Sequence, residues 1–222
     1  MNIILPGVDK VFDCNKQKCC SLVVENQKLL YDMITDITIQ IQGNDGNTVL
    51  SEDNKLLSIS KSVEIISQFI PFEMNTKTLV SKISSQMQKL AVADMNYMKT
   101  QEILAHWEKY LLELSIEMVG GIEFNKITAE SLIKAAGIHI DDVYDSLGEK
   151  LLDYFELVQE YDAKKLFVLV NLRSYMPDLE MEKFFKEILD RNIQIFLLES
   201  AERPLLKEEE RYIVDDNLCV IC

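Results

Sequence analysis

The segment 164–200 constrains the fold of this chain most, because it contains two apolar runs separated by one amphipathic stretch. The runs Leu166–Val170 and Ile195–Leu198 are rich in branched and aromatic side chains and do not alternate with polar residues. Such runs are typical of strands that are buried on both faces of a parallel sheet. The stretch between them starts at Pro177 and has one apolar stripe at helical spacing. The stripe consists of Met181, Phe184, Phe185, Ile188 and Leu189. The sequence therefore predicts a βαβ unit in an α/β fold.

Glu199 directly follows the second apolar run, which is the position of the acid in a Walker B strand. A nucleotide hydrolase also needs a glycine-rich loop that holds phosphates, followed by a lysine and a hydroxyl, in the pattern G-x-x-x-x-G-K-[ST]. This pattern is absent from the sequence, and the nearest candidate, Gly43 to Thr48, has no lysine and precedes a predicted strand. We interpret residues 43–48 as a turn. A nucleotide hydrolase with an unrecognised phosphate site stays an alternative that depends on Glu199 alone.

Both ends of the chain contribute elements to the predicted α/β domain. A helix capped by Asn26 is predicted near the start, and strands are expected at 3–5, 11–12, 20–24, 49–50, 56–59 and 63–66. From residue 76 the apolar period changes from two to about three and a half, which is typical of helices. We therefore expect a discontinuous α/β head domain made of residues 1–75 and 164–222, and an inserted α-helical leg domain made of residues 76–163.

The first half of the predicted leg has the apolar spacing of two helices that pack against each other as in a coiled coil. The apolar positions are Val80, Ile83, Met87, Leu90, Ile103, Trp107, Leu111, Leu114 and Met118. Two further helices are predicted, one from Thr128 to Gly137 and one that opens with a capping box at Ser146 and Glu149. A protein-binding adaptor that acts through this apolar seam is a second alternative.

The chain of 222 residues has a formal net charge of −14, which argues against nucleic acid as a partner. The charge is unevenly distributed, however. Residues 76–101 contain four lysines, Lys77, Lys82, Lys89 and Lys99, against the single acid Asp94. A basic face is therefore compatible with the acidic composition.

Five cysteines, an odd number, favour a reducing compartment over a disulfide framework. Cys219 and Cys222, together with Cys14, Cys19 and Cys20, suggest a zinc site, but a terminal strand with buried thiols is the simpler interpretation. No apolar run approaches the roughly 18 residues of a membrane helix, and the first residues do not resemble a signal peptide. We expect a cytoplasmic protein without membrane contact.

Three segments together resemble the CRISPR-associated spacer-acquisition accessory protein of type II-A systems. They are ESLIKAAGIHI at 130–140, KKLFVLVNLRSYM at 164–176 and IFLLE at 195–199. The resemblance implies an α/β head related to nucleotide hydrolases, with a degenerate phosphate site that lacks Walker A, and a protruding helical leg. It also implies a non-catalytic homotetrameric ring that binds ends of double-stranded DNA without sequence preference and supports the acquisition of new spacers in adaptive immunity. The adaptation integrase and the RNA-guided nuclease of the same system are its implied partners.

The resemblance further implies calcium near the connection between leg and head. The candidate ligands are Glu117, Glu123, Asn125 and Glu130, with backbone carbonyls and water completing the six to eight oxygens that calcium takes. Basic residues in or beside the family-like segments are the candidates for DNA contact. These are Lys134, Lys164, Lys165, Arg173 and Lys18.

Overall fold

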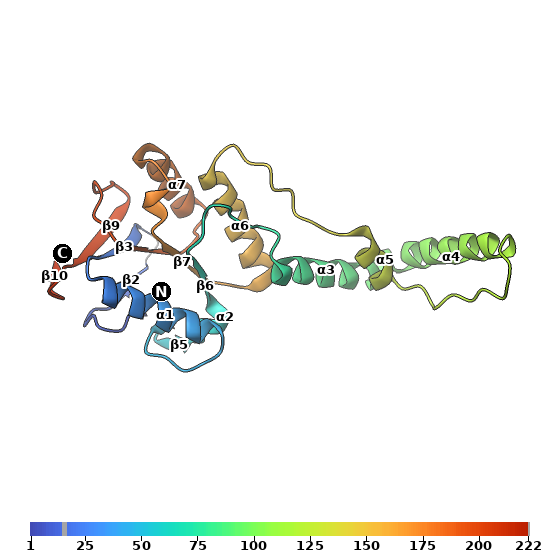
Figure 1. Ribbon diagram of the computed structural model, residues 1–222, viewed down its shortest axis with the longest axis horizontal. Helices are drawn as coiled ribbons and strands as arrows, with labels where there is room; N and C mark the ends of the chain where they lie inside the picture. Colours follow the sequence, from blue (N-terminus) through green and yellow to red (C-terminus); the bar gives the residue numbers. More distant parts are fainter. Residues whose placement is uncertain (15–16, 222) are drawn as a thin grey trace. The chain divides into compact units, whose positions relative to one another are not determined.

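The computed structural model describes residues 1–14 and 17–221 (Figure 1). The chain divides into two compact units. The head unit consists of Met1–Glu73 and Val143–Cys222, and the helical unit consists of Met74–Asp142. The chain is thus a mixed α/β protein, as the sequence predicts.

The head unit is built on a six-stranded sheet with the strand order β10-β9-β3-β8-β7-β6. Strands β3, β6, β7, β8 and β9 are parallel, whereas β10 pairs antiparallel with β9. The bounds are β3 (Cys19–Val24), β6 (Val63–Ile66), β7 (Leu166–Val170), β8 (Ile195–Glu199), β9 (Glu209–Val214) and β10 (Val220–Ile221). Every residue of β3, β7 and β8 is buried, which confirms the interpretation of the unbroken apolar runs.

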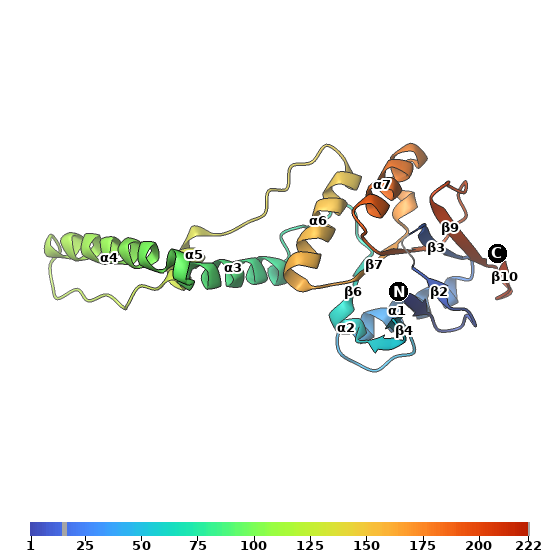
Figure 2. The same ribbon diagram turned by 180° about the vertical axis from the view of Figure 1, so that it is seen from behind.

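Helices cover both faces of this sheet. Helices α6 (Leu147–Asp162) and α7 (Asp178–Asp190) lie on one side and α1 (Gln27–Ile41) lies on the other, as both views show (Figures 1 and 2). Successive side chains of a strand point to opposite faces. Phe167 of β7 therefore stacks on Phe155 of α6, with ring centroids 4.1 Å apart, while its neighbour Val168 packs in the cluster that contains Met33 of α1.

A second, antiparallel sheet adds to the core on the α1 side. Its order is β2-β1-β4-β5, with β1 (Asn2–Ile4), β2 (Phe12–Asp13), β4 (Val49–Glu52) and β5 (Lys55–Leu57). The predicted strand at 56–59 was wrong in its second half. The carbonyl of Ser58 accepts hydrogen bonds from the N–H groups of Lys61 and Ser62, so the chain turns there into the short helix α2 (Ile59–Ser62).

The helical unit contains α3 (Lys77–Val92), α4 (Asp94–Ile116) and α5 (Ala129–Ala136). Thr128 caps α5 by accepting a hydrogen bond of 3.2 Å from the N–H of Ser131, and Gly137 ends it with φ 65°. Both ends agree with the prediction, because a hydroxyl satisfies a free N–H at the start and glycine tolerates the left-handed conformation at the end.

The prediction that α3 and α4 pack along a common seam was wrong. Only Ala93 separates the two helices, and α4 extends beyond the end of α3 within this unit (Figure 1). No residue of α4 is buried, and Ile103 and Trp107 are 51% and 44% exposed. The apolar seam of α4 is therefore uncovered in the described part of the single chain.

The helical unit also ends earlier than the predicted leg, at Asp142 and not at residue 163. The difference is α6, whose apolar residues Leu151, Phe155 and Val158 are buried in the head unit. Ser146 caps α6 as predicted, since its hydroxyl accepts a hydrogen bond of 3.2 Å from the N–H of Glu149. Among the described helices, none combines the length and the apolar character that crossing a membrane requires.

Candidate functional site

The carboxyl ends of β7 and β8 meet at one edge of the head sheet, where the side chains of Asn171 and Glu199 follow the two strands. Asn171 has a left-handed backbone (φ 57°), and its side-chain oxygen accepts a hydrogen bond of 2.8 Å from the N–H of Ser200. Glu199 is 3% exposed and accepts a hydrogen bond of 3.1 Å from the backbone N–H of Arg173. Burial raises the pKa of Glu199 to about 7, although the N–H and the charge of Arg173 oppose this shift. Glu199 is thus held by backbone, and near neutral pH a large share of it is protonated.

Arg173 is buried beside this edge and does not form a basic surface. Its guanidinium donates to Glu209 Oε2 at 3.1 Å, to Asp178 Oδ1 at 2.8 Å and to the carbonyl of Pro204 at 2.9 Å. Only 2% of its side chain is exposed. The prediction that Arg173 contacts DNA is therefore not supported, because the guanidinium is already neutralised by two carboxylates inside the head.

Glu209 is a residue of this network that the sequence analysis missed. Its carboxylate accepts hydrogen bonds from Ser21 Oγ at 2.5 Å and from the N–H of Leu206 at 3.2 Å, besides the bond from Arg173. In the sequence it belongs to the charged run 207–210, which resembles a solvated surface. Strand periodicity could have indicated this burial, because successive side chains of a strand point to opposite faces. Glu209 is buried at the start of β9, and its neighbour Glu210 is exposed.

The connection from β3 to α1 is where a phosphate loop would lie if this head bound nucleotides like a P-loop protein. It consists of only Glu25 and Asn26. The side-chain oxygen of Asn26 accepts a hydrogen bond of 2.9 Å from the N–H of Leu29. A free N–H of the first helical turn, which would attract a phosphate, is thus already paired with the chain itself.

In the turn at 43–48, backbone N–H groups are likewise already bonded to a side chain of the protein. Asp36 of α1 accepts hydrogen bonds of 2.8 Å from the N–H groups of Asn47 and Thr48, and one of 2.6 Å from the hydroxyl of Thr48. Burial tends to raise the pKa of Asp36, but these bonds and one from Gln40 hold it below its usual range. A carboxylate at these N–H groups repels phosphate, which confirms the interpretation of this segment as a turn and not a phosphate loop.

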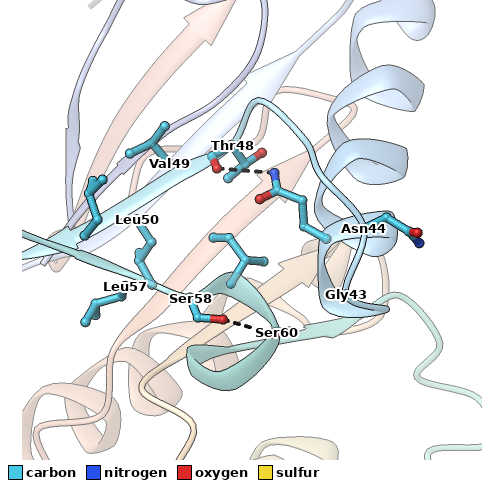
Figure 3. A pocket seen from close by; sticks show the side chains of 11 residues that line it. Gly43, Asn44, Thr48, Val49, Leu50, Leu57, Ser58 and Ser60 are labelled. Carbon is cyan, nitrogen blue, oxygen red and sulfur yellow. Dashed lines mark hydrogen bonds between the residues drawn. The ribbon is translucent and has the colours of Figure 1, made fainter.

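Beside this turn lies an open pocket of about 290 Å³ between the end of α1, the β4–β5 hairpin and α2 (Figure 3). Its apolar lining comes from leucines such as Leu50 and Leu57, and Ser58 and Ser60 form one side. The amide of Gln40 donates to the carbonyl of Thr48 at 3.2 Å. The described residues that line the pocket include no charged side chain, so the pocket offers no ionic contact to a phosphate or a metal ion.

The four lysines predicted to contact DNA lie in different surroundings. Lys164 is 8% exposed and donates to the carbonyl of Ser60 at 2.6 Å. Lys165 forms an ion pair of 2.6 Å with Glu52. Lys18 is exposed in the turn before β3, and Lys134 belongs to the helical unit, where it pairs with Glu130 at 2.7 Å. In the head unit, Lys164 and Lys165 are thus bonded to neighbouring groups of the protein itself.

The four candidate calcium ligands do not form one site within the chain. The side chains of Glu117, Glu123 and Asn125 are exposed, and Glu130 is engaged by Lys134, whose hydrogen bond and charge lower the pKa of Glu130. Within residues 1–14 and 17–221, no group of three or more His, Cys, Asp or Glu side chains is placed to hold a metal ion. The described part of a single chain therefore does not supply the six to eight oxygens that calcium takes, and calcium binding stays a prediction.

The cysteines do not form a zinc site in the described part of the chain either. Cys14, Cys19 and Cys20 are buried, and Cys219, predicted to be buried, is exposed. Cys222 lies outside the described residues. Burial, together with the nearby charges of Glu209 and Glu208, raises the pKa of the Cys19 thiol.

Comparison with known proteins identifies the family. A family model described as "CRISPR-associated protein (Cas_Csn2)" matches residues 40–218, which include most of both units. The chain is also similar to the CRISPR-associated protein Csn2 of Enterococcus faecalis, with 26% identity over 96 residues. That match covers 43% of this chain and 42% of the relative. The family model spans far more than half of the chain, and the chain therefore belongs to the Cas_Csn2 family of CRISPR-associated proteins.

Proposed function

We propose that this chain binds the ends of double-stranded DNA without catalysing a reaction, as one subunit of a homotetrameric ring that supports the acquisition of new spacers. The observation that carries the proposal is the family match over residues 40–218. The adaptation integrase and the RNA-guided nuclease of the same CRISPR system are the proposed protein partners. In this proposal DNA is held through its phosphates, which gives binding without sequence preference.

The head geometry supports a role without nucleotide hydrolysis. In the place of a phosphate loop the chain has the two-residue connection Glu25–Asn26. In the turn at 43–48, the N–H groups of Asn47 and Thr48 are already bonded to the carboxylate of Asp36. The head is in this respect a nucleotide-hydrolase-like sheet with a degenerate phosphate site. A hydrolase stays the second candidate because Glu199 occupies the position of a Walker B acid and has a raised pKa.

Binding to linear and to covalently closed circular DNA tests the proposal. A ring that encircles the duplex can thread onto a linear end but not onto a closed circle. We expect tight binding to linear duplex of any sequence, little binding to the circle, and recovery after a single double-strand cut. Affinity should fall by about 10³ to 10⁵ between roughly 50 and 200 mM salt if about six to ten phosphates are neutralised.

Equal affinity for both forms at one salt concentration would contradict a threaded ring. Turnover of ATP that is lost in Glu199→Gln would instead favour the hydrolase. An adaptor that acts only through protein contacts would bind neither form of DNA.

A further inference from the structure

A groove of about 660 Å³ lies between α3 and α5, entirely within the helical unit. Val80 of α3 and Ile133 of α5 contribute to its apolar lining, and both are partly buried. Lys77 of α3 and Lys134 of α5 also line it, together with serines of α3 that include Ser81. The groove thus combines an apolar lining with hydrogen-bond donors from two helices.

The groove is held open by contacts that do not depend on a ligand. Asn75, just before α3, donates to the carbonyl of Ile140 at 3.0 Å and accepts from the N–H of Ile140 at 2.6 Å. These two bonds tie the start of α3 to the segment that follows α5. The walls of the groove are therefore positioned in advance, which lowers the entropic cost of binding.

The charge of α3 is opposite to that of the chain as a whole. The chain has 37 Asp and Glu against 23 Lys and Arg, but α3 carries three lysines and no acid. Among the described residues that line the groove, Glu130 is the only one with a carboxylate, and it is paired with Lys134 at 2.7 Å. Ammonium and hydroxyl groups that donate hydrogen bonds, without a free carboxylate among them, favour a phosphate-bearing partner.

We infer that the α3–α5 groove binds the phosphates of one strand of duplex DNA, with Lys77 and Lys134 contacting them from its two sides. The inference rests on the proposed DNA-binding function and places phosphate contacts in the helical unit, whereas Lys164 and Arg173 of the head are buried. An acidic peptide is the other class of partner that such a groove would accept.

The test compares the full chain with two double variants of equal charge change. Lys77→Gln with Lys134→Gln removes two cations from the groove. Lys183→Gln with Lys186→Gln removes two exposed cations from α7 and is the matched control. Affinity for linear duplex is measured by fluorescence anisotropy across a range of salt concentrations, after circular dichroism has shown that all variants fold.

We expect the groove variant to bind about tenfold more weakly and its slope of log affinity against log salt to fall by about two per chain. The α7 variant should keep both values. Ser81→Asp, which adds a negative charge to the groove without removing a cation, should also weaken binding, whereas Ser81→Ala should not. As a direct readout, bound DNA should protect Lys77 and Lys134 from an amine-acylating reagent, and Lys183 and Lys186 should stay reactive.

If the wild type binds linear duplex and the groove variant binds as well as the α7 control, the groove assignment is wrong while the proposed function stands. If the wild type does not bind linear duplex even at low salt, the proposed function and the groove assignment both fail. A polyglutamate peptide that binds the groove when DNA does not would identify an acidic protein segment as the partner.

Discussion

Glu199 is the residue whose chemistry can be tested most directly, because its ordinary pKa of 4.5 is raised by burial to about 7. The folded chain keeps a proton that the unfolded chain has already lost, so this residue lowers the free energy of unfolding as the pH rises from about 4.5 to about 7. We expect the free energy of unfolding of Glu199→Gln to equal that of the wild type near pH 4. Near pH 8 it should be larger than that of the wild type by about 1–3 kcal/mol. Urea unfolding at both pH values measures this difference.

The exposed substitution Glu73→Gln is the control for this experiment and should show no such dependence on pH. Under the proposed function, Glu199→Gln also keeps its affinity for DNA. A difference in stability that is the same at both pH values would mean that Glu199 is ionised in the folded state.

Among single residues, the apolar core could be predicted from the sequence better than the buried charged residues could. The runs at 166–170 and 195–198 identified the core because the hydrophobic effect is non-directional, so burial of an apolar side chain requires no specific partner. Arg173 was misassigned because a buried arginine and a DNA-binding arginine look alike until their partners are known. Those partners, Glu209 and Asp178, come from β9 and α7, and no local pattern links them to Arg173.

At the scale of elements, α4 is a helix of 23 residues with no buried residue in the single chain. A stable helix with a long exposed apolar stripe is expected to be covered by another surface. Under the proposed tetramer, we expect Ile103→Glu with Trp107→Glu to reduce the mass measured by light scattering, because an unpaired carboxylate in an apolar contact is costly.

The control for α4 is Gln101→Glu, which adds a carboxylate on the opposite side of the same helix and should leave the mass unchanged. An unaltered mass for the double variant as well would show that the apolar stripe of α4 does not hold subunits together. The circular dichroism of all three proteins should agree, since each substitution affects an exposed position.

The sequence predicted the existence of most elements but not how α3 and α4 pack. A heptad-like spacing shows that two helices each have an apolar stripe, and it does not show whether the stripes face each other. The stripe of α4 is exposed in the structure, so it does not face that of α3. The carbonyl of Leu90 accepts from the side chain of Asn96 at 2.9 Å, and that of Ala91 accepts from Thr100 at 2.7 Å, so the junction is fixed by hydrogen bonds.

At the scale of the whole molecule, the response to calcium follows from where the candidate ligands lie. Because Glu117, Glu123 and Glu130 are not gathered in the described part of one chain, we expect calcium to raise the melting temperature only if a second chain completes the ligand set. Thermal unfolding of the wild type and of Glu123→Gln measures this. Stabilisation by calcium that is lost in Glu123→Gln would show that a second chain completes the ligand set.

The short passage from β3 to α1 also limits how such a head could acquire nucleotide chemistry. A phosphate loop needs about eight residues in G-x-x-x-x-G-K-[ST], and the chain provides two, Glu25 and Asn26. No series of point mutations supplies the missing backbone. An ancestor with such a loop would have had to lose it by deletion, and an engineer who wished to restore it would have to begin with an insertion.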